Sequence, residues 1–132
     1  MDKSKALVHV KENLTEADSL LGLFQATKPF KIWLFLILGP LAVLSVRTYI
    51  IAVSEQGIYF HRLNLMGKFT DFDFFTYNEI NQVKFGKGWL QCPAAFLFFN
   101  DRRLYVKAQL KGVKKVAKLS GDLQRIIEQK IR

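Results

Sequence analysis

The chain has 132 residues; half are hydrophobic, 12 are phenylalanine, and 20 Lys and Arg against 11 Asp and Glu give a net charge of +9. This length fits one domain, because domains commonly hold about 100–200 residues. The apolar content excludes a disordered chain, and the single cysteine, Cys92, excludes an internal disulfide or a Cys-based zinc site within one chain. The basic excess predicts an anionic partner, such as a membrane surface, nucleic acid or an acidic protein.

The first predicted element is a short N-terminal helix over about residues 15–23. Thr15 is a suitable N-cap, and Asp18 follows it at the spacing of a capping box. The apolar content of this segment comes from Leu20, Leu21, Leu23 and Phe24.

An uncharged apolar run of 15 residues, 32–46, lies between Lys31 and Arg47. As a helix it would be about 22 Å long, which is short of the roughly 30 Å hydrocarbon core of a bilayer. Two interpretations remain open: contact with a membrane, or a buried pair of strands broken at Gly39-Pro40. The residues that would contact the membrane or an interface are Trp33, Leu34, Phe35, Leu36 and Leu38.

The run starts too far from the N-terminus, and behind too many charges, for a secretory signal. We therefore expect a cytoplasmic protein, at the inner face of the membrane if it binds one.

The composition changes after the run, and this predicts that the chain has two parts. Residues 1–46 hold the N-terminal helix and the apolar segment, which contributes a strand, and residues 47–132 form the main domain.

From residue 47 onward, short runs rich in β-branched and aromatic residues alternate with turn signals. Short connections between them favour an antiparallel meander. The predicted strands cover residues 47–54, 57–64, 69–77, 80–85, 94–99 and 103–109. A C-terminal amphipathic helix follows, with Ser120 as its N-cap and Asp122 in its first turn.

Residues suited to catalysis are scattered. His9 and His61 lie in separate segments without a metal-binding spacing, and Asp71 and Asp73 are predicted to face solvent. The glycines near Lys87 lack the spacing of a phosphate-binding loop. We expect no enzymatic activity, no cofactor, no metal and no small-molecule substrate. Nucleic-acid binding is also disfavoured, because the strand phenylalanines are expected in the core rather than as stacking platforms.

Residues 102–118 carry seven basic residues and no acidic residue. Each Lys or Arg near an anionic leaflet contributes about 1 kcal/mol to attraction, although a charge run is also common on an ordinary solvated face. The candidates for contact with an anion or a lipid surface are Arg102, Arg103, Lys107, Lys111, Lys114, Lys115 and Lys118, with Lys84 and Lys87 beside a glycine pair.

The order of elements resembles the bacterial pleckstrin-homology-like (PH-like) domains. Three parts carry the resemblance: the hairpin at residues 49–60, the segment 75–90 with its Glu-Ile-x-x-Val pattern and glycines, and the hairpin at 96–107 before a closing helix. The resemblance implies an α+β, mainly β fold, a bent antiparallel barrel of about seven strands with a C-terminal amphipathic helix.

Only six strands follow residue 46, so the seventh is expected from residues 20–46, either at 20–27 or within the apolar run. If the strand precedes the run, the run cannot cross a membrane, because both of its sides would lie in one compartment.

Together these features predict a PH-like binding or scaffold module that is peripheral to the membrane through segment 32–46 and a basic face. The alternative is a soluble homo-oligomerising or protein-binding domain without membrane contact, because ring-forming members occur among the domains that it resembles. Specificity for inositol lipids is not implied.

Overall fold

The computed structural model describes residues 3–14, 18–28, 47–64, 68–87, 91–99, 103–109 and 118–131. The six strands expected after residue 46 are present, and a seventh precedes them. In chain order the elements are α1 (Lys3–Glu12), β1 (Leu20–Lys28), β2 (Arg47–Ser54), β3 (Gly57–Leu63), β4 (Phe69–Thr76), a 3₁₀ helix (Tyr77–Glu79), β5 (Ile80–Phe85), β6 (Gln91–Phe98), β7 (Arg103–Gln109) and α3 (Gly121–Lys130).

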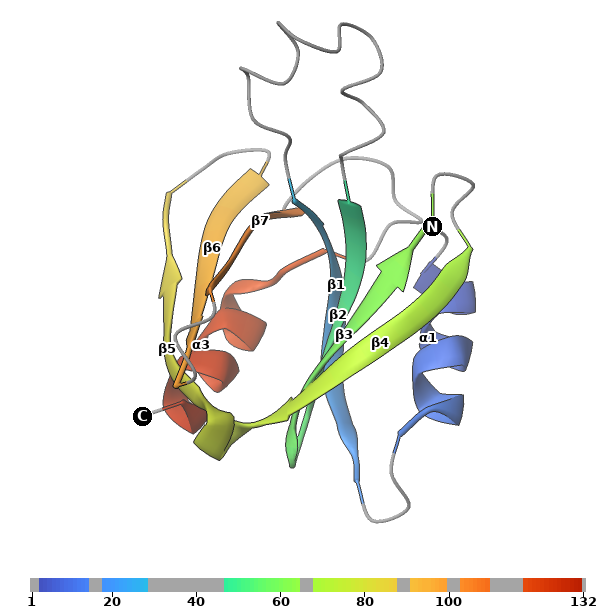
Figure 1. Ribbon diagram of the computed structural model, residues 1–132, viewed down its shortest axis with the longest axis horizontal. Helices are drawn as coiled ribbons and strands as arrows, with labels where there is room; N and C mark the ends of the chain where they lie inside the picture. The colour runs from blue at the N-terminus through green and yellow to red at the C-terminus, as the bar shows by residue number, and fades with distance from the viewer. Residues whose placement is uncertain are drawn as a thin grey trace, which may run out of the picture.

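The seven strands form one antiparallel sheet in the order β4-β3-β2-β1-β7-β6-β5. Among the described residues, its two halves, β1–β4 and β5–β7, pair with each other where Ala26 lies opposite Ala108 and Thr27 lies opposite Lys107. Figure 1 shows β1 and β7 rising from opposite sides and meeting at the upper end, so the sheet bends there. The C-terminal ends of β1, β3, β5 and β7 all lie at this upper end (Figure 1).

Helix α3 covers the inner face of the bent sheet (Figure 1). Leu123 and Ile127 of α3 join the core cluster that both halves of the sheet contribute to. The helix begins as predicted, because the Ser120 hydroxyl oxygen accepts a hydrogen bond from the Leu123 N–H at 3.1 Å. Gly22 of β1 permits the close approach, since a Cβ there would lie 2.9 Å from Leu123 Cδ1.

Helix α1 covers the other face of the β1–β4 half. Ala6 and Val10 of α1 pack with Ile50, Ala52 and Tyr59 in a second core cluster. Strands β2 and β3 are therefore buried on both faces, and this explains their continuous apolar sequences.

The helix predicted over residues 15–23 is wrong, because Leu20–Lys28 forms strand β1. Both faces of β1 are covered: Phe24 packs in the inner cluster, whereas Leu23 packs in the outer one. The register also shifts between Leu20 and Gly22. These two features remove the alternation typical of a strand. The N-terminal helix lies earlier, at Lys3–Glu12, and the seventh strand precedes the apolar run.

Asp18 does not cap a helix but fastens β1 to the β2–β3 turn. Its carboxylate accepts hydrogen bonds from Ser54 Oγ at 2.7 Å, the Gln56 N–H at 3.2 Å and the Tyr59 hydroxyl at 3.2 Å. These partners lie 36 to 41 residues away in sequence. The capping pattern of Thr15 and Asp18 gave no indication of them.

His61 is fully buried under α1 and β4. Its ring centroid lies 5.3 Å from that of His9 and 4.9 Å from that of Phe72. Neither ring nitrogen has a hydrogen-bond partner among the residues that the structure describes. Burial, and secondarily the charge of His9, lowers the pKa of His61 from 6.5 to about 4.

We expect the free energy of unfolding to decrease as the pH falls from the unfolded pKa of His61 toward its folded value. Between the unfolded pKa of 6.5 and the folded value of about 4, the unfolded chain binds the proton that folded His61 excludes. The free energy of unfolding should fall by about 2 kcal/mol between about pH 7.5 and pH 5. Urea titrations at both pH values measure it. A His61→Phe variant should lose much less, and an equal loss would assign the effect to another group.

Candidate functional site

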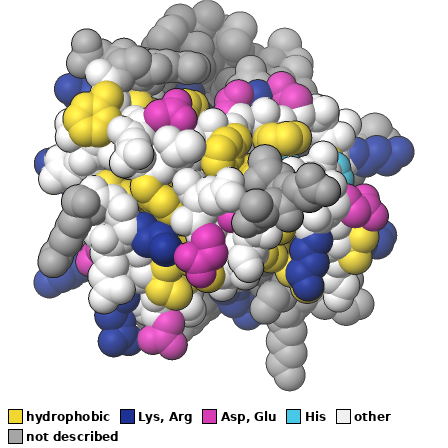
Figure 2. Space-filling view, turned by 90° about the horizontal axis from the view of Figure 1, so that it is seen from below, with side chains coloured by type: hydrophobic (Ala, Val, Ile, Leu, Met, Phe, Trp, Pro, Cys, Tyr) yellow, Lys and Arg dark blue, Asp and Glu magenta, His cyan; other side chains and the backbone are white. Residues whose placement is uncertain are grey.

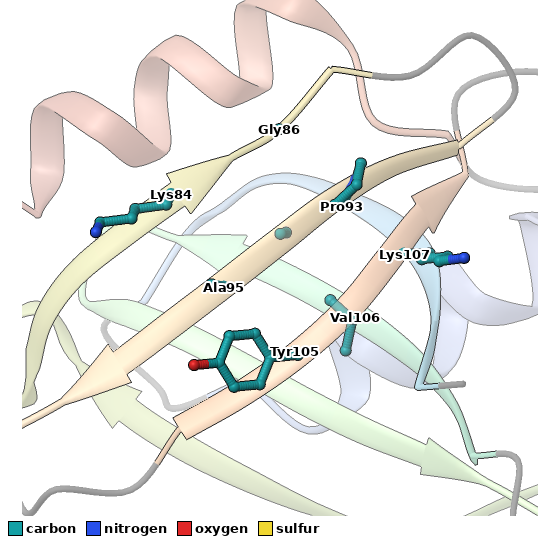
Figure 3. A pocket seen from close by; sticks show the side chains of 8 residues that line it. Lys84, Gly86, Pro93, Ala95, Tyr105, Val106 and Lys107 are labelled. Atoms are coloured by element: carbon teal, nitrogen blue, oxygen red, sulfur yellow. The ribbon is translucent and has the colours of Figure 1, made fainter. Parts of the chain in front are cut away.

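The candidate site is the outer face of the β5–β7 half, on the side away from α3 (Figure 3). Strand register aligns its outward residues in rows: Lys84, Ala95 and Tyr105 form one row across the three strands. Two residues after Tyr105 on β7, Lys107 lies opposite Pro93, and two residues before Tyr105, Arg103 lies opposite Leu97. We call the surface that carries Lys84, Arg103 and Lys107 the basic face.

Glycine, proline and alanine residues form the floor of the basic face. Gly86 and Pro93 lie opposite each other, and the Gly86 N–H donates to the Pro93 carbonyl at 2.7 Å. Pro93 has no N–H with which to return a bond, and the Cys92 thiol lies 3.2 Å from the Gly86 carbonyl oxygen as a donor. Burial raises the pKa of Cys92, which fits a structural thiol rather than a nucleophile.

The face holds a shallow groove of about 300 Å³ with an apolar centre and positive borders. Pro93 and Ala95 line its floor, and the half-exposed ring of Tyr105 lies beside them. Figure 3 shows the amines of Lys84 and Lys107 pointing to opposite sides of the groove. No acidic residue is among the described residues that line it.

The cations on the basic face are dispersed rather than convergent. Lys84 and Lys107 stand on strands that are two positions apart, which corresponds to about 10 Å, and their amines diverge. Neither they nor Arg103 has an ion-pair partner in the described part of the chain. This arrangement does not form a clamp for one phosphate, but it fits an extended anionic surface.

Several charged groups elsewhere in the molecule form ion pairs. Arg62 donates to Asp71 and Asp73, each at 2.6 Å, so these two carboxylates bind an arginine that the sequence analysis did not connect with them. The hydrogen bonds to Asp71 and then Asp73 raise the pKa of Arg62 above its ordinary value. Figure 2, which views the lower end of the molecule, shows acidic and basic side chains interspersed.

Of the residues predicted to meet an anion, the structure places Lys84, Arg103 and Lys107 on one sheet face. Lys87 is exposed just after β5, whereas Lys118 is half-buried and lines a different groove with Lys11. The other predicted contacts lie outside the described residues, namely Arg102, Lys111, Lys114 and Lys115 and the apolar Trp33, Leu34, Phe35, Leu36 and Leu38.

The ends of the segment 29–46 are anchored beside the basic face. Thr27 pairs with Lys107, and the next residue, Lys28, pairs with Arg47. The chain therefore leaves β1 and enters β2 at neighbouring positions, one strand away from Lys107. Sequence reasoning could not find this proximity, because it depends on the β1–β7 register.

The structure brings His9 and His61 together, but no group of three His, Cys, Asp or Glu residues suited to a metal ion occurs in the described ranges. Within those ranges, no helix combines the length and the apolar content that a bilayer crossing requires.

Comparisons with known proteins identify a solved structure with a similar fold. No family model matches the chain, and no curated protein matches its sequence. Among solved structures, the hSac2 domain from human phosphoinositide phosphatase Sac2 is similar, with a TM-score of 0.58 over 96% of this chain and 77% of that chain. The two sequences are 9% identical, so the similarity concerns the fold alone.

Proposed function

We propose that this protein is a non-enzymatic PH-like binding module that attaches peripherally to an anionic membrane surface at the cytoplasmic side. The basic face supplies electrostatic attraction, and the apolar run 32–46 supplies hydrophobic contact. One observation carries the proposal: three cations without described partners lie on a sheet face that no described element covers, next to the strand ends that flank the run.

Two contributions are needed because either alone is weak. Three basic residues at about 1 kcal/mol each provide roughly 3 kcal/mol, which is less than the 4.1 kcal/mol of a millimolar complex. Burying one large apolar side chain adds about 1.5–3 kcal/mol. The run contains Trp33 and Phe35 among its apolar residues, so a few inserted side chains suffice for stable attachment.

The pairing of Lys28 with Arg47 supports a peripheral rather than a spanning attachment. A segment whose two ends are held at neighbouring residues must return to the side that it left. In this proposal the side chains of the run enter one leaflet without crossing the bilayer.

The fold neighbour is compatible with this proposal without defining it. The hSac2 domain comes from a phosphoinositide phosphatase, and phosphoinositides are anionic lipids. Neither the phosphatase activity nor a headgroup specificity is part of the proposal.

Flotation with lipid vesicles tests the proposal. The full chain should float with vesicles that contain about 30 mol% phosphatidylglycerol at about 50 mM salt, because the Debye length there exceeds 10 Å. Binding should weaken at about 500 mM salt, where the charges are screened, and neutral phosphatidylcholine vesicles should retain less protein.

Replacing Phe35 and Leu36 by serine should abolish the binding that persists at high salt. Absence of flotation at low salt would refute membrane attachment. A chain that stays unbound and elutes as an oligomer in size-exclusion chromatography would instead favour the soluble, self-associating domain.

A further inference from the structure

Strand β5 ends the sheet, and its outer edge is unpaired among the described residues. Within the described ranges it pairs with β6 alone. Because the Gly86 N–H bonds to the Pro93 carbonyl, the alternation of an antiparallel ladder directs Lys84 and Gln82 toward β6 as well. Val83 and Phe85 therefore direct their N–H and C=O groups toward the free edge.

Helix α3 forms a wall beside this edge. A groove of about 390 Å³ lies between them, lined by Asn81, Gln82 and Val83 of β5 and by Glu128 and Ile131 at the end of α3. Figure 1 shows β5 at the margin of the sheet with α3 next to it. The half-buried side chains of Val83 and Ile131 give the groove an apolar strip.

The other edge strand, β4, is less suited to strand addition because of its charged side chains. Along β4, the carboxylates of Asp71 and Asp73 bind Arg62, and charged side chains of this kind discourage strand addition. On β5 the charged Lys84 belongs to the basic face, away from the groove. Free backbone groups next to an apolar strip are found at the edge of β5.

We infer that the edge of β5 binds an extended peptide segment of a partner protein by strand addition. The segment pairs with the backbone of Val83 and Phe85 and lays alternate apolar side chains against Val83 and Ile131. The only charged group lining the groove in the described residues is the exposed carboxylate of Glu128. A Lys or Arg of the bound segment therefore forms an ion pair with Glu128.

This site is independent of the membrane proposal. The peptide lies at the edge and on the α3 side of β5, whereas Lys84, Arg103 and Lys107 point to the opposite face. One molecule therefore has room for both a lipid surface and a peptide.

The test begins with the full chain as bait for a phage-displayed library of random peptides of about ten residues, the upper length of an ordinary strand. A selected peptide is then synthesised, and amide hydrogen exchange measured by NMR shows where it binds on the protein. In the free protein, the Val83 and Phe85 amides should exchange faster than the Lys84 amide. The peptide should slow exchange at Val83 and Phe85 by about ten-fold or more and leave Lys84 unchanged.

Two matched substitutions on α3 complete the test. Glu128→Lys should weaken a selected basic peptide by about ten-fold, whereas Gln129→Lys, an exposed neighbour that does not line the groove, should leave its affinity unchanged. Thermal unfolding checks that both variants remain folded.

Three results would overturn the inference: no selected peptide, protection confined to other amides, or Val83 and Phe85 already protected in the free monomer. Protection that rises with protein concentration in the absence of peptide would identify a second copy as the occupant, and would overturn it too. None of these results depends on whether the protein binds vesicles.

Discussion

Replacing Gly57 by alanine should destabilise the protein by at least about 3 kcal/mol. Gly57 begins β3 and pairs with Thr76 of β4. A Cβ at this position would lie 2.2 Å from the Phe75 carbonyl oxygen and 2.9 Å from Phe74 Cε1. Because the nearest atom belongs to the backbone of the paired strand, relief requires β4 to move away from β3.

Urea unfolding followed by circular dichroism measures this effect. Gly121→Ala is the matched control, because no heavy atom lies within 4 Å of a Cβ at the first residue of α3. The control should be unchanged or stabilised by up to about 1 kcal/mol. A Gly57→Ala protein within 1 kcal/mol of the parent would mean that the β3–β4 pairing adjusts more easily than we infer.

Removing the three charges of the basic face should weaken binding to anionic vesicles by about a hundred-fold. The triple variant Lys84→Gln, Arg103→Gln and Lys107→Gln loses roughly 3 kcal/mol of attraction at about 1 kcal/mol per charge. All three side chains are exposed and have no described ion-pair partners, so folding should be unaffected. Vesicle titration at low salt gives the affinities.

A second triple variant separates position from net charge. Lys5→Gln, Lys11→Gln and Arg125→Gln remove three exposed charges from α1 and α3, so both variants have a net charge of +6, which is 9 minus 3. The control should bind vesicles within a few-fold of the parent. Equal losses in the two variants would show that only the net charge matters, and the basic face would then have no special role.

The sequence predicted the elements correctly where local signals determine the structure. Strands β2 to β7 follow β-branched and aromatic runs bounded by turns, and Ser120 caps α3 as its position predicts. Strand β1 was expected only as one of two positions for the seventh strand, and its first residues were assigned to a helix. Layers on both of its faces bury Leu23 and Phe24, so its apolar pattern has no strand period.

The candidate site was only partly predictable for a related reason. Composition identified Lys84, Arg103 and Lys107 separately, but their common face depends on the register between β5, β6 and β7. The Asp71–Arg62 and Asp73–Arg62 ion pairs likewise need the β3–β4 pairing. Contacts between distant segments leave no periodic signal in a single sequence.

The position of α3 in the chain has a consequence for biosynthesis. Leu123 and Ile127 complete the inner core, yet every strand that they cover is translated before them. The seam between the halves also joins Thr27 to Lys107, a separation of 80 residues, 107 minus 27. Such distant pairing is slow, and the inner face of the nascent sheet stays uncovered until α3 leaves the ribosome. The emerging chain therefore presents its phenylalanine-rich strands to chaperones until α3 is available to cover them.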